Sequence, residues 1–296
     1  MTKIFRGVYT AIITPFTNDG NVDYESLKKI IEFQIEKGVA GIVPCGTTGE
    51  SPTLSHDEHD KVIEFTVKEV AGRVKVIAGT GSNSTDEAIR LTRHAKDVGV
   101  DGALVVSPYY NKPTQLGLYR HFKKIADEVD VPCVIYNIEG RTGVNVETDT
   151  LVKLMSECKN IVAVKEASGN IAQIKEVISK KNEDFCVLSG DDGIALDLIE
   201  AGGDGVISVA SNVIPGIMVE MINCALDQKF EKAREHETEL KNFFDVEFVE
   251  TNPIPIKTAV AMMGMCEEVF RLPMCEIEKE EHREQLANEM KKLNLI

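Results

Sequence analysis

The chain has 296 residues, 43% of them hydrophobic, which is enough apolar surface for a large core in one or two domains. Its formal net charge of −15 argues against nucleic acid and anionic membranes as partners, because both are negatively charged. We find no signal-peptide pattern, no apolar stretch of membrane-spanning length and no C-x-x-C pair among the seven scattered cysteines, which together predict a cytoplasmic protein with reduced cysteines.

Short apolar runs recur along the chain, and segments with helical spacing of apolar residues lie between them. Amphipathic segments such as Tyr24–Lys37, Glu58–Val70 and Asp86–Val98 have this spacing. The apolar runs, which we predict to be strands, are Val8–Ile13, Gly41–Cys45, Val74–Ala78, Ala103–Ser107, Cys133–Asn137, Val162–Lys165, Cys186–Ser189 and Val206–Val209.

Two helix starts have the pattern of a capping box, in which a hydroxyl residue is followed three positions later by glutamate. Ser55 with Glu58 and Ser84 with Glu87 both fit it. Glycines then follow several predicted helices, at positions where a left-handed cap conformation is needed.

Eight alternating strand–helix units predict a parallel sheet of the α/β class. They close most economically into a (β/α)₈ TIM barrel, whose typical size is about 250 residues. An open doubly wound sheet is the alternative, but no G-x-G-x-x-G follows the first strand. We expect the barrel over residues 1–226 and a C-terminal helical domain over residues 227–296, which would cover one barrel face or form an assembly surface.

The active site of a barrel enzyme lies at the carboxyl ends of its strands, so the residues after each run are the candidates. Hydroxyls, phenols, one arginine and one lysine gather there, although folding does not require them. The segments concerned are Gly46–Glu50, Pro108–Lys112, Tyr136–Gly143, Lys165, Gly190–Asp192 and Ile207–Ser208.

Lys165 is the most informative of these residues. It closes an apolar run and shares one strand face with Ile161 and Ala163, so its amine should be partly desolvated. Desolvation favours the neutral amine, which can attack a carbonyl and form a Schiff base. A lone lysine at a strand end would more often lie at the surface, and the residues around this one favour the catalytic interpretation.

The neighbouring residue types suit the same chemistry. Thr47 and Thr48, between glycines, offer hydroxyls and accessible backbone N–H groups to a carboxylate. Tyr136 can pass protons while a carbinolamine becomes an imine, and Arg141 can bind a second carboxylate through two parallel hydrogen bonds. Taken singly, each of these residues could equally be structural.

Six motifs occur in the order G-T-T-G-E, P-Y-Y-N, Y-N-x-x-x-R-T-G, V-K-E-A-S-G, S-G-D-D and G-V-I-S-V. Together they resemble the dihydrodipicolinate synthase family of the pyruvate-dependent class I aldolase superfamily, from Phe5 through the helical tail. The resemblance implies a homotetrameric barrel lyase, a dimer of dimers, that needs no cofactor. It also implies condensation of pyruvate with L-aspartate 4-semialdehyde in diaminopimelate and lysine biosynthesis.

The resemblance assigns roles to eight residues of the candidate active site. Tyr110 would reach into a neighbouring subunit's site, and Arg141 would bind the carboxylate of the semialdehyde. The implied residues are Lys165 as the Schiff-base lysine, Tyr136, Thr47 and Tyr110 as the proton relay, and Thr48, the backbone of Ile207, Gly190 and Arg141 for substrate binding. Glu139 stands where the family generally has proline, and its charge could weaken the grip of Arg141 unless it points outward.

A second site, for feedback by L-lysine, is implied at a subunit interface. Its pattern is matched by Ser51, His56, His59, Asn83, Glu87 and Tyr109. Pro52 replaces a small residue, which leaves inhibition open. Judged from residues alone, His56–His59 is simply an acidic helix start.

Three other functions are less consistent with these residues. N-acetylneuraminate or keto-deoxy-sugar lyases of the same superfamily are the alternatives within the aldolase class, and of these the sialic acid lyases lack the R-T-G arginine that is present here. A metal-dependent barrel enzyme is disfavoured because H-x-H and H-E-x-x-H are absent, although His56 and His59 could share a helix face. A barrel that only senses a keto acid would be expected to lack Lys165 or Tyr136.

Overall fold

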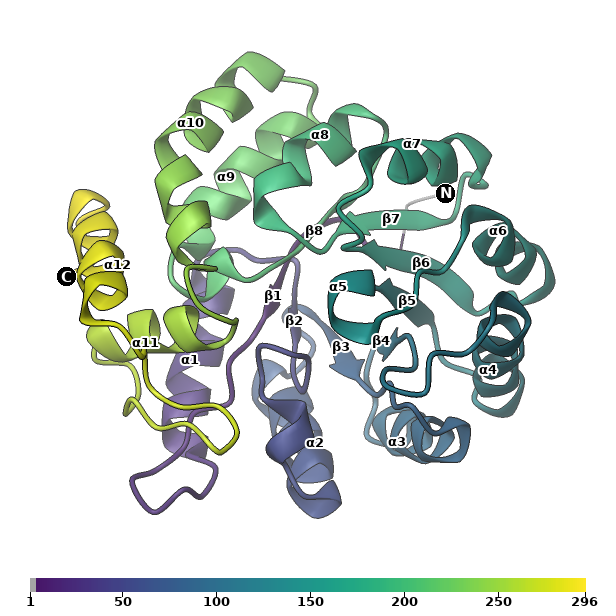
Figure 1. The fold of residues 1–296 in the computed structure, drawn as a ribbon, viewed down its shortest axis with the longest axis horizontal. Helices are drawn as coiled ribbons and strands as arrows, with labels where there is room; N and C mark the ends of the chain where they lie inside the picture. The colour runs from purple at the N-terminus through teal and green to yellow at the C-terminus, as the bar shows by residue number, and fades with distance from the viewer. Residues whose placement is uncertain (1–3) are drawn as a thin grey trace.

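The computed structural model describes residues 4–296, in which eight parallel strands close into a barrel (Figure 1). Each strand pairs with the next along the chain, and β1 pairs with β8. The strands are β1 Gly7–Ala11, β2 Gly41–Val43, β3 Lys75–Gly79, β4 Gly102–Val106, β5 Cys133–Asn137, β6 Ile161–Glu166, β7 Cys186–Ser189 and β8 Gly205–Ser208. The predicted TIM barrel is therefore confirmed, and the open sheet is excluded because the strands close on themselves.

Helices surround the barrel and continue into a C-terminal helical segment (Figure 1). Those of the barrel are α1 Tyr24–Glu36, α2 His56–Val70, α3 Thr85–Asp97, α4 Gln115–Glu128, α5 Glu139–Thr142, α6 Thr148–Glu157, α7 Ile171–Lys180, α8 Ala195–Glu200 and α9 Pro215–Leu226. The later helices are α10 Phe230–Val246, α11 Ile254–Met262 and α12 Glu280–Lys292, and short 3₁₀ helices are η1 Ser51–Thr53, η2 Asp192–Ile194 and η3 Ala210–Asn212. The division into domains at residue 226 stays a prediction.

All eight predicted runs form strands, with small differences at their ends. The second run is two residues shorter than predicted, because Pro44 has no N–H to donate to a neighbouring strand and Cys45 has a positive φ of 55°.

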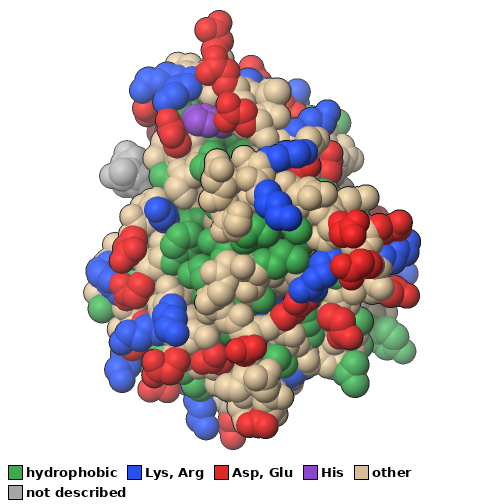
Figure 2. All heavy atoms as spheres, turned by 90° about the vertical axis from the view of Figure 1, so that its left-hand side faces the viewer, with side chains coloured by type: hydrophobic (Ala, Val, Ile, Leu, Met, Phe, Trp, Pro, Cys, Tyr) green, Lys and Arg blue, Asp and Glu red, His purple; other side chains and the backbone are tan. Residues whose placement is uncertain are grey.

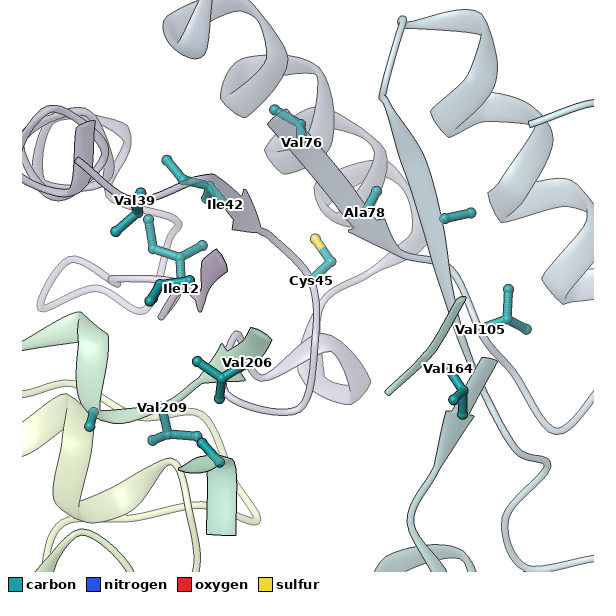
Figure 3. Close-up of a cluster of buried hydrophobic side chains, with 14 of the residues drawn as sticks. Ile12, Val39, Ile42, Cys45, Val76, Ala78, Val105, Val164, Val206 and Val209 are labelled. Atoms are coloured by element: carbon teal, nitrogen blue, oxygen red, sulfur yellow. The ribbon is translucent and has the colours of Figure 1, made fainter. Parts of the chain in front are cut away.

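Alternation along the strands divides the buried side chains into two layers. One set fills the barrel and includes Tyr9, Val134, Ala163, Leu188 and Ile207. The other set points toward the helices, where Figure 3 shows residues such as Val76, Val105, Val164 and Val206. Five of the seven cysteines are buried, in agreement with a packing role.

One of the two predicted capping boxes forms in full. Ser55 accepts a hydrogen bond from the backbone N–H of Glu58, whose carboxylate accepts from the Ser55 N–H. The second predicted capping box forms only in part. Ser84 accepts from the N–H of Glu87, but the N–H of Ser84 donates to Ser82 because the Glu87 carboxylate binds Ser82 and His56 instead.

The C-terminal helices form one side of the molecule. Helix α10 packs on α9, and α12 packs on α10 and α11. Figure 2, which faces this side, shows acidic and basic side chains interspersed around a central hydrophobic area, so the net negative charge does not give this face a single sign. In the part of the chain that the structure describes, no helix is both long enough and apolar enough to cross a bilayer.

Candidate active site

A cavity lies at the carboxyl ends of the barrel strands, at the place predicted for the site. Six of the predicted residues meet there, on loops and strands far apart in sequence. The residues lining it are Ala11, Val43, Gly46, Thr47, Thr48, Leu104, Tyr136, Ile138, Arg141, Lys165, Gly190, Val209, Phe248 and Asn252.

Lys165 points into the barrel from β6, on the same face as the fully buried Ala163. The residue is only 5% exposed, and its Nζ lies 4.2 Å from the centroid of the Tyr136 ring. The register of β5 and β6 pairs Tyr136 with Lys165, which brings amine and phenol together. A Cβ at Gly190 would lie 2.7 Å from the Cβ of Ala167 and 2.9 Å from the Lys165 Cε, so glycine leaves room there for the lysine side chain.

The turn that carries Thr47 and Thr48 is held by buried polar contacts. The Thr48 hydroxyl accepts from the side-chain amide of Asn252 at 3.1 Å, and the Gly49 carbonyl accepts from Thr14 at 2.7 Å. Beneath the turn, a Cβ at Gly79 would lie 2.1 Å from the carbonyl oxygen of Cys45, so only glycine allows this approach.

The same turn ends at Glu50, which forms a buried ion pair with the C-terminal segment. Its carboxylate accepts from the amine of Lys257 at 2.6 Å and from the backbone N–H of Arg271 at 3.2 Å. The Lys257 Nζ also lies 4.0 Å from the centroid of the Phe16 ring. The C-terminal helices therefore help to position the threonine turn.

Arg141 lines the cavity from α5, and its guanidinium donates to the backbone carbonyl of Asn252 at 3.0 Å. Glu139 is exposed, whereas the Arg141 guanidinium bonds the Asn252 carbonyl. The outward orientation considered for Glu139 fits this arrangement.

Two predicted residues do not line the cavity in a single chain. Ile207 is buried in the barrel interior, and Val209, two positions later, lines the cavity in its place. Tyr110 is 90% exposed, on a loop where its φ is positive at 72°. Its place in a neighbouring subunit's site stays a prediction.

The residues predicted for L-lysine gather in a second groove, which shares Thr47, Ile138 and Arg141 with the first cavity. Ser51, His56, His59, Glu87 and Tyr109 all line it. Asn83 is not among its lining residues, and its carbonyl accepts from Asn111 at 2.9 Å.

Hydrogen bonds and burial set the charges in this groove. Glu87 binds His56 at 2.9 Å, and the hydroxyl of Ser82, together with His56, holds the pKa of Glu87 below its usual value. Burial lowers the pKa of His59 to about 4, so this imidazole is neutral at pH 7. Across residues 4–296, no three His, Cys, Asp or Glu side chains stand together as a metal site would require.

Sequence reasoning missed the contribution of the C-terminal segment to the cavity. Phe248 and Asn252 line it, and Lys257 supports the threonine turn. Lys257 did carry a signal, because it is a lysine inside the apolar run Ile254–Ala261, the same anomaly that marked Lys165. Asn252 and Phe248 carry no such signal.

A closed barrel with a buried lysine beside a phenol at the strand ends defines a class of protein, the aldolase-type barrel lyases. The model of the "Dihydrodipicolinate synthetase family" matches residues 4–293. The 4-hydroxy-tetrahydrodipicolinate synthase of Aquifex aeolicus (strain VF5) is 56% identical over 292 residues, which cover 99% of each chain. The chain belongs to the dihydrodipicolinate synthetase family, and its function is that of a synthase of this family.

Solved structures agree with this assignment. The crystal structure of dihydrodipicolinate synthase from Aquifex aeolicus superposes with a TM-score of 0.97 and covers 98% of this chain and 99% of its own, at 56% identity. The Acinetobacter baumannii enzyme complexed with pyruvate has a TM-score of 0.96 at 45% identity, covering 98% and 99%. The Cyanidioschyzon merolae enzyme with lysine bound has a TM-score of 0.97 at 40% identity, covering 100% of both chains.

Proposed function

We propose that this protein condenses pyruvate with L-aspartate 4-semialdehyde through a Schiff base at Lys165, in diaminopimelate and lysine biosynthesis. The observation that carries the proposal is the buried amine of Lys165, 4.2 Å from the Tyr136 ring centroid in a cavity that also holds Arg141. The pyruvate-bound relative from Acinetobacter baumannii supports the first substrate. A sugar-acid lyase is not favoured, because the close relatives are named as synthases.

The chemistry follows from these residues. The amine of Lys165 attacks the keto carbon of pyruvate, and loss of water from the carbinolamine gives the imine. Tyr136 and Thr47, with Tyr110 from a neighbouring subunit, pass the protons that these steps release and require. Removal of a methyl proton then makes that carbon a nucleophile toward the aldehyde.

Binding groups for the two substrates lie around the lysine. Thr48, the backbone of Ile207 and Gly190 hold pyruvate. Arg141 binds the carboxylate of the semialdehyde through two charge-assisted hydrogen bonds. The other basic residue in the cavity lining is Lys165, which is used for the Schiff base.

The assembly is proposed to be a homotetramer made from two dimers, in the cytoplasm. The nearly complete exposure of Tyr110 supports a role across the dimer interface. Mixing two inactive variants, Lys165→Ala and Tyr110→Phe, tests it, because a mixed dimer then contains one site with both native residues. We expect activity to return on mixing. Tyr119→Phe, a change at a tyrosine bonded to Glu157, is the control. If it too is inactive alone and regains activity on mixing with Lys165→Ala, the shared site is contradicted.

L-Lysine is proposed as a regulator that binds in the second groove. The lysine-bound relative from Cyanidioschyzon merolae supports this, as does the meeting of five predicted residues there. Calorimetric titration with L-lysine should show binding that is lost in His56→Ala. Equal binding by both proteins would contradict the site.

The substrate assignment is tested by steady-state assays. With pyruvate present, we expect consumption of L-aspartate 4-semialdehyde and no cleavage of N-acetylneuraminate. Cleavage of N-acetylneuraminate without condensation of the semialdehyde would reverse the assignment.

A further inference from the structure

Glu247 is a buried acid that no basic group or hydrogen-bond donor of residues 4–296 is seen to compensate. It caps the carboxyl end of α10, is 0% exposed, and neither of its carboxyl oxygens has a hydrogen-bond partner among the described residues. Helix α10 packs against η2, which begins at Asp192, and the carboxyl groups of Asp192 and Asp191 are the charged neighbours of Glu247. An ionised carboxylate would be strongly destabilised in these surroundings, because nothing compensates for its lost hydration.

Asp192 is the opposite case, a buried carboxylate with good donors on one oxygen. Its Oδ2 accepts from the backbone N–H groups of Val209 at 2.8 Å and Ala210 at 3.0 Å, and the Ser208 side chain also interacts with it. Its Oδ1 has no partner in the described residues. These donors favour the ionised form of Asp192 and oppose the effect of burial, which raises its pKa, and one of its oxygens is left to accept a further donor.

We propose that Glu247 is a neutral carboxylic acid that donates a hydrogen bond to Asp192, and that this pair positions the pyruvate end of the active-site cavity. The positioning role rests on the proposed function, whereas the protonation state does not. A single proton accounts for the unpartnered Oδ1 of Asp192 and for one of the two unpartnered oxygens of Glu247.

The pair connects three elements that line the cavity. Asp192 binds the backbone just after β8, where Val209 lines the cavity, and it lies two residues after Gly190, which lines it too. Phe248, the residue after Glu247, is also part of the lining. Glu247 is therefore a positioning residue that ties the end of α10 to the ends of β7 and β8.

The electrostatic surroundings agree with a proton on Glu247. Burial, followed by the charges of Asp192 and Asp191, raises the pKa of Glu247 well above its usual value, and burial raises that of Asp192 as well. On α10 itself, Lys241 is exposed and about 9 Å away along the helix axis, and Lys232 and Arg234 are about 20 Å away. Several charged groups on the elements packed against α10 are paired elsewhere: Asp197 and Glu200 with Arg234, Glu220 with Lys232, His282 with Glu250, and Arg283 with Glu268.

Infrared difference spectroscopy tests the protonation state in the intact protein. We expect a carboxylic-acid C=O band at neutral pH that disappears in Glu247→Gln. Glu250→Gln is the matched control, because Glu250 accepts from His282 and two backbone N–H groups and should contribute no such band. Identical spectra for wild type and Glu247→Gln would overturn the proposal, whatever the substrates are.

Kinetics test the positioning role. Gln can still donate to Asp192 and should keep KM for pyruvate within about twofold, whereas Leu cannot donate and should raise KM by about threefold to tenfold, with kcat changed less. The same KM in both variants, whether native or raised, would overturn the role of a donor. If Glu247→Leu does not fold, Glu247→Asp takes its place in the comparison with Glu247→Gln. The shorter side chain of aspartate moves the donor away from Asp192. If borohydride does not trap pyruvate on the wild-type protein, the proposed function is refuted. The infrared result on the protonation of Glu247 is not affected by that outcome.

Discussion

Replacing Lys257 with methionine isolates the ion pair that joins the C-terminal helices to the threonine turn. The side chains of Lys257 and Glu50 are 0% and 1% exposed, and their charged atoms are 2.6 Å apart. Burial lowers the pKa of Lys257 while Glu50 opposes this shift, so the amine depends on its partner for its charge. Methionine has a similar length and removes only the charge and the donors.

The magnitude follows from the burial of both groups. Removing one member of such a pair leaves an uncompensated buried charge and costs about 3–5 kcal/mol. The backbone N–H of Arg271 still donates to Glu50, which places the expected cost near the lower end. Glu50→Gln should be similarly destabilising, and the double variant should cost about as much as one single change, since it leaves no unpaired charge.

Urea denaturation at one fixed protein concentration measures these costs as free energies of unfolding. Lys232→Met is the matched control, because its pair with Glu220 is 52% exposed on both sides and, screened by water, should contribute little to stability. Additive losses in the double variant, or a loss below about 1 kcal/mol for Lys257→Met, would refute the reasoning. kcat/KM should fall in parallel, because Thr47 and Thr48 lie on the same turn.

Three further predictions concern catalysis and pH. Pyruvate with borohydride should irreversibly modify Lys165, and a modified peptide from elsewhere in the chain would refute the assignment. The variant Lys165→Ala should lose nearly all turnover and keep its fold. Arg141→Ala should raise KM for the semialdehyde by about 10- to 100-fold and spare pyruvate trapping, so loss of trapping would mean a different role. Arg271 holds the pKa of Glu58 at about 2 instead of 4.5, so the stability from this ionised group is present above about pH 4.5 and lost as pH falls toward 2. The difference in unfolding free energy between wild type and Glu58→Gln should narrow over that window, and a constant difference would contradict it.

The strands and many of the helix ends were predictable because their causes are local. A strand is recognised by a short apolar run and a helix by a 3.6-residue period, and the Ser55–Glu58 cap lies within four residues. The reciprocal bond of the Ser84 capping box is missing because Ser82 and His56, the latter 31 positions earlier, hold the Glu87 carboxylate instead.

Much of the candidate site was also predictable, because barrel topology places all strand ends on one face. Once eight strands were recognised, Lys165, Tyr136 and the two threonines had to lie near one another. Barrel topology alone was therefore enough to predict that these separate motifs line one cavity.

The amino-acid sequence by itself determined the barrel fold and indicated the catalytic role of Lys165 and the groups around it, since periodicity and strand order are properties of neighbouring residues. Packing of the C-terminal helices determined the rest: Asn252 on Thr48, Lys257 on Glu50 and Glu247 facing Asp192. Lys257 and Glu50 are 207 positions apart, and no local pattern encodes which buried polar groups will meet over such a separation. Those contacts arise only when burial removes water and leaves each polar group to find a partner within the protein.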